Sequence, residues 1–236
     1  PKSMPGLQWW GDICVRTDIE NIKKIDTKSG KESILVTLEE VNEALKNGEM
    51  PYKLTSHIKP LRTLMAASLP WGDRNVITFT QYDDRTPGQK YMIWYDFSKK
   101  KIVNLFNLQG EGPTNFDFCK ENGYMAYTIG NDLYVAHERD FSSMVNPKVT
   151  GNQQQEKDVV YGQAVHRNEF GIMKGTFWSP KGTYLAFYRM DQSMVTDYPQ
   201  VNTTARIAEL VPDKYPMAGM TSHKVTVGIY NVKDGK

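Results

Sequence analysis

Cysteine is scarce in this sequence. Only two of the 236 residues are cysteines, Cys14 and Cys119, and they form no CxxC or Cys/His pattern. They are therefore either buried thiols or one disulfide, and a cysteine-based metal site is not expected. The four histidines, at positions 57, 137, 166 and 223, also lack the spacing of metal ligands. The sequence predicts no metal site.

Charge of one sign and long apolar stretches are missing as well. The 29 Lys and Arg residues nearly balance the 27 Asp and Glu residues, and the densest basic run is DFSKKKIV. Such dispersed charge disfavours a nucleic-acid-binding face. The mean hydropathy is -0.55, and no apolar run approaches the length of a membrane span. The sequence predicts no nucleic-acid partner and no membrane span.

The common catalytic and phosphate-binding motifs are absent too. Neither Gly-x-Ser-x-Gly nor the glycine-rich loops GxGxxG and GxxxxGK[ST] occur. The adjacent carboxylates Asp83 and Asp84 stand in QYDDRTPG, a turn in which solvated aspartates are ordinary. We therefore expect no catalytic residue in this chain and no cofactor.

One segment has the pattern of a helix, TLEEVNEALKNG at residues 37–48. Thr37 and Glu40 match a capping box, and Gly48 is a stop signal. Apolar side chains recur on one face, at positions 38, 41 and 45. We expect a short structural helix, inserted near the N-terminus and packed through that face.

After Arg62 the chain consists mainly of short runs rich in aromatic and β-branched residues, which is typical of strands. The runs are NVITFTQYDD, KYMIWYDF, KIVNLFN, YMAYTIG, DLYVAH, TYLAFYRMD and KVTVGIYNV. Hairpin turns are indicated by FSKKKI, IGNDLY and NVKDGK. These patterns predict an all-β fold.

An internal echo refines this prediction. FCKENGYMAY, residues 118–127, aligns without gaps on WSPKGTYLAF, residues 178–187, and WGDRNVITF at 71–79 is a weaker copy. Repeated four-stranded units are the mark of a β-propeller, although a β-sandwich has similar strands. The strand-rich part holds about four blades at 40–45 residues each. We expect residues 1–236 to be an incomplete propeller portion, with a free-standing small propeller as the alternative.

The cluster VHRNEFG, residues 165–171, is the most polar candidate site. Glu169, with the amide of Asn168 beside it, has the chemistry to hold an ammonium group by charge-assisted hydrogen bonds. The alternative is an exposed loop in which Glu169 pairs with Arg167 or Lys174, which contributes little to stability. The residues alone leave both interpretations open.

Three motifs identify a relationship. They are the WSP turn and the YRMDQSMV run in FWSPKGTYLAFYRMDQSMVTDYP, and YPMAG in YPMAGMTSHKVTVGIYNV. Together they resemble the N-terminal β-propeller of the dipeptidyl peptidase IV family of serine peptidases, in the form found in Bacteroidetes-type bacteria. The resemblance includes ILVTLEEVNEALKNGE and runs from about Asp12 to the last residue.

The resemblance implies an eight-bladed propeller standing over a C-terminal α/β-hydrolase domain with a Ser/Asp/His triad, a domain absent from this chain. In that family two acidic residues upstream of WSP hold the free N-terminal amine of the substrate. They correspond here to Asn168 and Glu169, so an amide replaces the first acid. The family's carbonyl-binding arginine, counted back from Asp96, corresponds to Arg85. The alternative for Arg85 is an ion pair with Asp83 or Asp84.

A second arginine is expected to be structural, because Arg189 and Asp191 in YRMD match a family motif that we interpret as a pair bracing a blade. The implied activity is release of Xaa-Pro or Xaa-Ala dipeptides from peptides with a free N-terminus. Replacement of one acid keeps a prolyl tripeptidyl peptidase open as an alternative. A non-enzymatic binding propeller and an envelope-associated structural propeller are open as well. The resemblance also implies export to the periplasm or cell envelope, and a homodimeric full-length protein.

Overall fold

The computed structural model describes residues 6–47, 57–68, 75–108, 112–119, 121–137, 149 and 157–235. Within these residues, small antiparallel sheets dominate and a single α-helix is present. The chain divides into two compact units. Unit 1 comprises Pro1–Pro113, Phe118–Met125 and Ala136–Asn146, and unit 2 comprises Thr114–Asp117, Ala126–Val135 and Pro147–Lys236. Each unit is described by itself.

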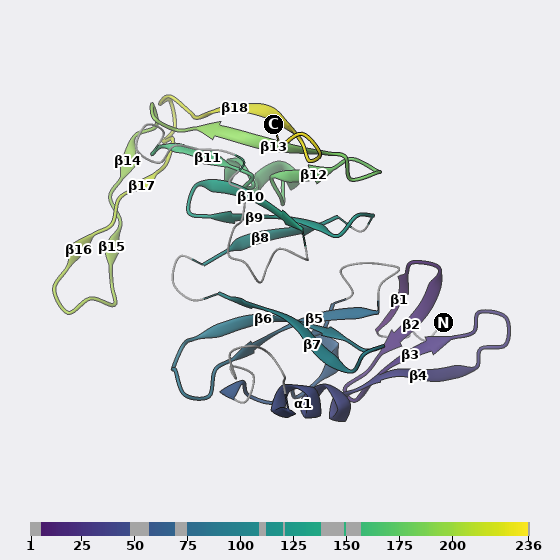
Figure 1. Cartoon of the computed structure of the whole chain (residues 1–236). Coiled ribbons are helices and arrows are strands. Elements are labelled where there is room, and N and C mark those ends of the chain that lie inside the picture. The colour runs from purple at the N-terminus through teal and green to yellow at the C-terminus, as the bar shows by residue number, and fades with distance from the viewer. Residues whose placement is uncertain are drawn as a thin grey trace. The chain divides into compact units, whose positions relative to one another are not determined.

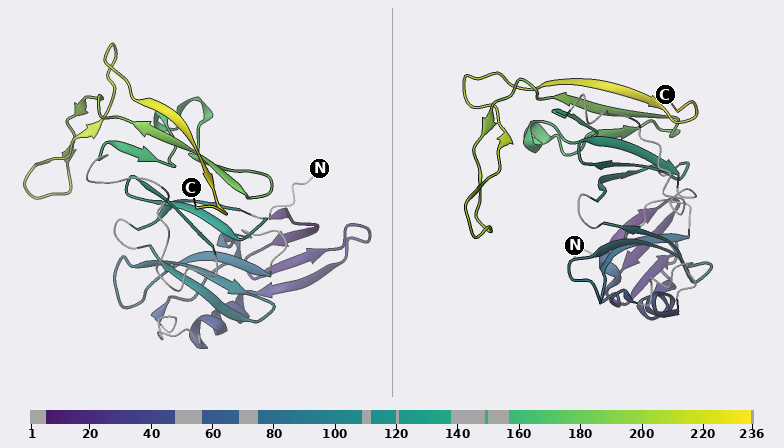
Figure 2. Two further views of the ribbon diagram at one scale, coloured as in Figure 1. Left: turned by 45° about the horizontal axis from the view of Figure 1, so that its top comes forward. Right: turned by 60° about the vertical axis from the view of Figure 1, so that its left-hand side comes forward.

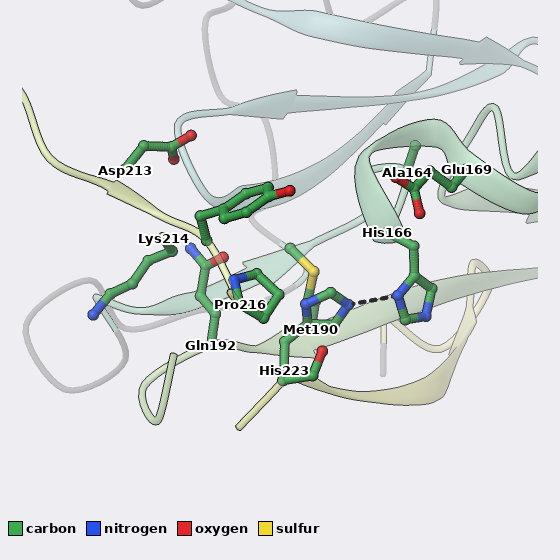
Figure 3. Close-up of a pocket in the computed structure, with 11 residues that line it drawn as sticks. Ala164, His166, Glu169, Met190, Gln192, Asp213, Lys214, Pro216 and His223 are labelled. Atoms are coloured by element: carbon green, nitrogen blue, oxygen red, sulfur yellow. Dashed lines mark hydrogen bonds between the residues drawn. The ribbon is translucent and has the colours of Figure 1, made fainter. Parts of the chain in front are cut away.

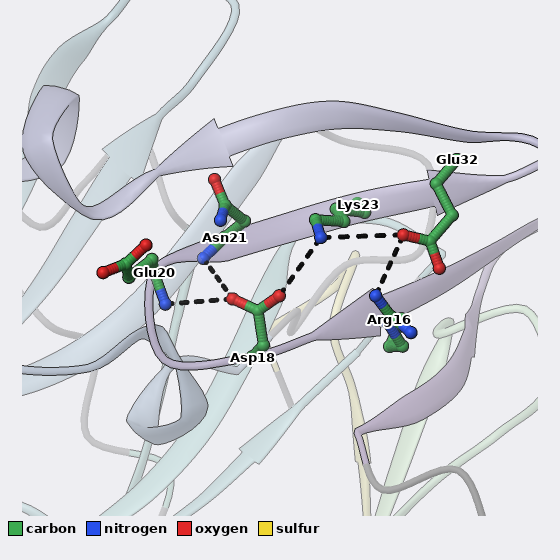
Figure 4. Close-up of polar contacts among 6 residues, drawn as sticks. All are labelled: Arg16, Asp18, Glu20, Asn21, Lys23 and Glu32. Carbon is green, nitrogen blue, oxygen red and sulfur yellow. Dashed lines mark hydrogen bonds and ion pairs between the residues drawn. The ribbon is translucent and has the colours of Figure 1, made fainter.

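Unit 1 begins with a four-stranded sheet of order β1-β2-β3-β4, drawn in purple in Figure 1. Its strands are β1 (Leu7–Trp10), β2 (Ile13–Thr17), β3 (Asn21–Ile25) and β4 (Glu32–Thr37). An ion-pair ladder crosses three of these strands (Figure 4). Glu32 accepts from Arg16 at 2.9 Å and lies 3.6 Å from Lys23, which lies 3.4 Å from Asp18. Because these side chains are partly exposed, the ladder contributes little to stability.

The predicted helix is confirmed as α1 (Leu38–Asn47). The hydroxyl of Thr37 accepts a hydrogen bond from the backbone N–H of Glu40 at 3.2 Å, as an N-cap does. Val41 and Leu45 are 0% and 2% exposed in the core of unit 1, and Leu38 packs against that core. The apolar face therefore anchors the helix. The expected stop at Gly48 lies outside the described residues.

The second sheet of unit 1 has the order β5-β6-β7. Its strands are β5 (Val76–Tyr82), β6 (Lys90–Asp96) and β7 (Lys101–Asn107), and the short 3-10 helix η2 (Leu64–Ala66) precedes them. The predicted FSKKKI hairpin joins β6 to β7. Asp96 accepts hydrogen bonds from the backbone N–H groups of Ser98 (3.0 Å) and Lys99 (3.1 Å) in this turn. Lys100 completes it in the left-handed region, at φ 54°.

The internal echo corresponds to one local structure formed twice. In the sheet of order β10-β9-β8, Cys119 N–H donates to the carbonyl of Tyr124 at 2.8 Å, between β8 (Thr114–Phe118) and β9 (Tyr124–Ile129). Sixty residues later Ser179 N–H donates to the carbonyl of Tyr184 at 2.9 Å. The strand β10 (Asp132–His137) follows the predicted turn at Gly130. The sequence repeat is thus a repeat of the same strand connection.

Unit 2 contains the sheet in which one connection between strands holds the polar cluster VHRNEFG. Its strands are β11 (Val159–Tyr161), β12 (Thr176–Trp178), β13 (Tyr184–Asp191) and β18 (Lys224–Asn231). β11 and β12 pair with different parts of β13, while β18 pairs with all eight of its residues. The 3-10 helix η4 (His166–Gly171) connects β11 to β12.

A long excursion separates β13 from β18. Residues 197–214, which we call the arm, form two short ladders, and Figure 2 shows the arm extending away from the β13–β18 sheet. β14 (Asp197–Tyr198) pairs with β17 (Asp213–Lys214), and β15 (Val201–Asn202) pairs with β16 (Glu209–Leu210). The sequence patterns did not predict the arm.

These sheets are the blades of a partial β-propeller. Apart from the two short ladders of the arm, they are antiparallel, three- or four-stranded and built mainly from chain neighbours, as propeller blades are. Cys14 and Cys119 are both buried, free thiols, which settles the alternative that the sequence left open. No helix in the described part of the chain is long and apolar enough to cross a membrane.

Candidate functional site

A cavity of about 390 Å³ lies in unit 2, beside η4 (Figure 3). Glu169 and His166 enter it from η4, and residues at the ends of β13, β17 and β18 form the other walls. The lining residues are Ala164, His166, Glu169, Met190, Gln192, Asp213, Lys214, Tyr215, Pro216, Ser222 and His223. Most of them carry polar side chains, so the cavity is suited to a polar or charged ligand group.

The backbone of η4 is strained. His166, Asn168 and Phe170 have φ angles of 53°, 62° and 58°, a region that residues with a Cβ avoid. Such a conformation costs about 1–2 kcal/mol for an ordinary side chain such as that of Phe170, and less for Asn168. Val165, 3% exposed, anchors the start of this segment, whereas Phe170 is 85% exposed. Strain of this kind persists where the surrounding structure enforces it, and it concentrates at ligand-binding sites.

Gly175, just before β12, allows the chain that leads into η4 to pass very close. A Cβ on Gly175 would lie 2.1 Å from the backbone oxygen of Gln163, so only glycine fits. The Gly175 carbonyl also accepts from the backbone N–H of Tyr188 at 2.9 Å, which ties the contact to β13. The close approach therefore fixes the chain shortly before η4.

Glu169 presents an exposed carboxylate to the cavity. Among the residues that the structure describes, this carboxylate has no ion-pair or hydrogen-bond partner. Lys174, one partner expected for an ordinary loop, instead donates to Asp117 at 3.1 Å. The side chain of Arg167, the other candidate, lies outside the described set. Glu169 is thus available to a ligand cation.

Two imidazoles meet in the wall next to Glu169. His166 Nδ1 and His223 Nε2 are 3.0 Å apart, a hydrogen-bond distance drawn as a dashed line in Figure 3. Both side chains are partly buried. Burial, and then the neighbouring His166, lower the pKa of His223 below its usual value. His223 is therefore neutral at neutral pH.

The opposite side of the cavity carries one acid and one base from β17, Asp213 and Lys214 (Figure 3). Lys214 Nζ donates to the carbonyl of Val195 at 3.0 Å and lies 3.0 Å from a carboxylate oxygen of Asp197. Its charge is therefore partly neutralised.

The structure places the other predicted site residues as follows. Asn168 is exposed next to Glu169 but does not line the cavity. Arg85 belongs to unit 1 and is exposed in the turn between β5 and β6. Asp83 accepts hydrogen bonds from the backbone N–H groups of Thr86 (2.8 Å) and Arg85 (2.7 Å), and these bonds lower its pKa although burial opposes them. No side-chain ion pair between Arg85 and either neighbouring aspartate occurs in the described turn.

Arg189 and Asp191 occupy the same face of β13 two residues apart. The Arg189 guanidinium lies 5.9 Å from the centre of the Tyr161 ring. Asp191 accepts from the backbone N–H (3.0 Å) and hydroxyl (2.7 Å) of Ser193. These two bonds lower the pKa of Asp191, and Arg189 adds a smaller electrostatic contribution. Both residues thus contact their own sheet and the turn that follows it.

Sequence reasoning missed His223 as a site residue. It stands 57 positions after His166, in a segment without a motif for it. Only the pairing of β18 with β13 brings it to η4. His166 belonged to the cluster already singled out, but nothing in the sequence predicted a histidine partner.

Comparison with known proteins gives consistent results. Residues 72–236 match a family model described as the dipeptidyl peptidase IV (DPP IV) N-terminal region. A protein from Phaeosphaeria nodorum, described as a dipeptidyl-aminopeptidase B, is 29% identical over an alignment of 133 residues that covers 49% of this chain. The chain spans 14% of the length of that relative.

Two solved structures are similar over the whole chain. One, from Bacteroides ovatus and described as a dipeptidyl aminopeptidase IV, has 42% identity and a TM-score of 0.72, and this chain covers 29% of it. The other, Porphyromonas gingivalis dipeptidyl peptidase 4, has 21% identity and a TM-score of 0.62, and this chain covers 32% of it. The second likeness is one of fold alone.

Proposed function

We propose a role for this chain, which belongs to the dipeptidyl peptidase IV family. It serves as the propeller part of a serine exopeptidase. In that role it recognises the free N-terminus of a peptide and controls access to the catalytic domain. The reaction itself is assigned to a C-terminal α/β-hydrolase domain of the full-length protein. The favoured products are Xaa-Pro or Xaa-Ala dipeptides. Residues 1–236 are then an incomplete propeller, with the 37–48 helix inserted in it.

One observation carries the proposal. Glu169 holds a carboxylate at the wall of an open polar cavity, and no described side chain neutralises it. A peptide ammonium that enters the cavity would form charge-assisted hydrogen bonds to this carboxylate, each stronger than a neutral one. Glu169, which lines the cavity, is also the residue that the family motif assigns to amine binding. Geometry and motif thus support the same role.

The remaining residues receive supporting roles. Asn168, which stands where the family has its first acid, assists Glu169, and Arg85 orients a backbone carbonyl of the substrate. Such positioning lowers the barrier of a reaction that other groups perform. Arg189 and Asp191 brace the blade. Because Asn168 is an amide where the family has an acid, the amine seat is less charged than one with two acids. Tripeptide release by the same family chemistry is therefore the second candidate.

Partners and location are proposed on the same basis. The full-length protein would form a homodimer, and the arm offers an apolar surface for it, since Val201, Ile207 and Leu210 are 57%, 80% and 67% exposed. Such exposure on one projecting element is typical of interaction sites. Export to the periplasm or cell envelope is proposed because of the likeness to the structure from Bacteroides ovatus.

The test is Glu169→Gln in the full-length enzyme. Loss of a hydrogen bond to a charged group costs about 1.5–3 kcal/mol. The value of kcat/KM for free-amine peptides should therefore fall by about tenfold or more, and Glu169→Asp should recover part of it. Glu121→Gln, at another exposed turn carboxylate, should leave it unchanged. An unchanged kcat/KM in Glu169→Gln would refute the amine-binding role, and equal binding of N-acetylated peptides would favour a binding module with another ligand.

A further inference from the structure

The paired imidazoles have a fixed hydrogen-bonding capacity. Each neutral imidazole carries one N–H donor and one acceptor nitrogen. The contact between His166 Nδ1 and His223 Nε2 uses one donor and one acceptor. Whichever ring donates, the two remaining nitrogens are therefore one donor and one acceptor. The neutral pair always keeps one acceptor for a ligand.

Protonation removes that acceptor. When the pair gains one proton, three N–H groups and one lone pair are present, and the internal contact uses one of each. Both remaining nitrogens are then donors, and the wall carries a positive charge. A neutral pair thus suits a cationic hydrogen-bond donor, and a protonated pair repels it.

We propose that the neutral His166–His223 pair is a second recognition element of the Glu169 cavity, accepting a hydrogen bond from the peptide ammonium, so that protonation of the pair rejects the substrate. This inference rests on the proposed function. It gives the ammonium a carboxylate and an imidazole nitrogen as partners, in a cavity where Asn168 supplies no lining atom. The pair is a specificity determinant and makes substrate binding depend on pH.

The surroundings of the pair favour the neutral form in the empty cavity. Glu169 faces the cavity from the same element as His166, and Asp213, Lys214 and Tyr215 face it from β17 and the segment after it. Lys214 is held at Asp197. Burial, and then the neighbouring His166, lower the pKa of His223. Arrival of an ammonium favours the neutral pair further, because a like charge disfavours protonation.

The backbone gives a second, independent indication that the position of His166 is enforced. This residue adopts φ 53°, yet its ring still meets His223 at a centroid distance of 4.5 Å. Phe170, which is also left-handed, contacts the His166 ring edge-on at 6.0 Å. A strained backbone that delivers an imidazole to a cavity wall is consistent with a ligand-binding role.

The experiment measures the affinity of the full-length protein for the dipeptide Ala-Pro by calorimetry between pH 5.5 and 7.5, with a metal chelator present. In this window ordinary carboxylates are already ionised and the peptide amine is largely protonated, so imidazoles dominate the titration. The dissociation constant of the wild type should rise by about threefold to tenfold as the pH falls across it. The rise should be clearly smaller in His223→Gln and in His166→Asn than in the wild type. Asn is chosen at position 166 because it tolerates positive φ.

A matched control separates this effect from general acid sensitivity. His137 is a half-buried histidine whose Nε2 contacts the carbonyl of Asn122 at 3.1 Å, outside the cavity. His137→Gln should keep the pH dependence of the wild type. Thermal unfolding of each variant establishes that the fold is intact, and the two pair variants check each other.

The outcomes distinguish the inference from the function on which it rests. If Glu169→Gln weakens binding but both pair variants keep the wild-type pH dependence, the inference is overturned and the proposed function stands. If the wild-type dissociation constant for Ala-Pro does not change with pH, the inference is overturned as well. If Glu169→Gln binds Ala-Pro as tightly as the wild type does, the proposed function itself is overturned. A pH dependence that is weaker than that of the wild type in both pair variants, together with weak binding by Glu169→Gln, supports both.

Discussion

Gly175→Ala should disturb the fold and the cavity together. The new Cβ would lie 2.1, 2.3 and 2.5 Å from the O, C and N atoms of Gln163. Ordinary carbon contacts are about 3.5–4.0 Å, so the two segments must separate by more than about 1 Å. The obstructing atoms are backbone, and no rotamer change relieves them. Overpacking of this kind costs about 1–3 kcal/mol.

The displacement also reaches the site, because Gln163 precedes η4 by only a few residues. We expect the thermal midpoint to fall by about 2–4 °C for each kcal/mol lost, and binding of free-amine peptides to weaken. Scanning calorimetry of the full-length protein measures the first effect, and titration with Ala-Pro measures the second.

Gly171→Ala is the matched control. Gly171 has φ 75°, and a Cβ added there would meet no atom within 4 Å, so this variant tests backbone strain without overlap. It should cost about 1–2 kcal/mol and leave Gln163 in place. If Gly175→Ala unfolded at the wild-type temperature and bound the peptide with wild-type affinity, the claim that this glycine positions η4 would be wrong.

Two further predictions concern the β6–β7 turn of unit 1. Lys100→Gly should raise the free energy of unfolding by about 0.5–1 kcal/mol, because glycine accepts φ 54° without strain. The ion pair that is lost joins the exposed Lys100 to a partly buried Glu40 at 3.4 Å and offsets only part of this gain. A lower denaturation midpoint would contradict this. Burial raises the pKa of Asp96, but hydrogen bonds from Ser98 and Lys99 outweigh it and lower the pKa. The carboxylate therefore stabilises the fold above about pH 4. The free energy of unfolding should be about 1–3 kcal/mol lower in Asp96→Asn than in the wild type at pH 7, and this difference should vanish as the pH falls through the folded pKa. Urea titrations at pH 7 and pH 3 measure it.

Sequence patterns predicted the strands whose own residues strongly favour β structure. KYMIWYDF and TYLAFYRMD are dense in aromatic and β-branched residues, and they form β6 and β13. The strands before residue 38 were missed. NIKKI and ESILVT have burial patterns without regular alternation. Lys23 of the first and Glu32 of the second belong to the surface ion-pair ladder, in which Glu32 also pairs with Arg16 of β2. Period-two reasoning has little to detect there.

The site was predictable only in part, for a similar reason. Glu169 lies within a contiguous polar cluster next to a recognisable motif, so sequence reasoning could find it. His223 becomes its neighbour through the β13–β18 pairing, which spans the whole arm. The left-handed backbone of η4 carries little local signal either, since Phe170 is not a residue that favours positive φ. Tertiary structure alone brings these groups together.

The arm has a consequence for the order in which the protein folds. β13 ends at Asp191 and β18 begins at Lys224, so the two strands pair only after a loop of about thirty residues has closed. Relative to a tight four-residue turn, this closure costs about 2 kcal/mol of chain entropy. Long-range pairing of this kind is slow compared with local hairpins. Since His223 arrives with β18, we infer that η4 acquires its histidine partner late, when the blade is otherwise complete.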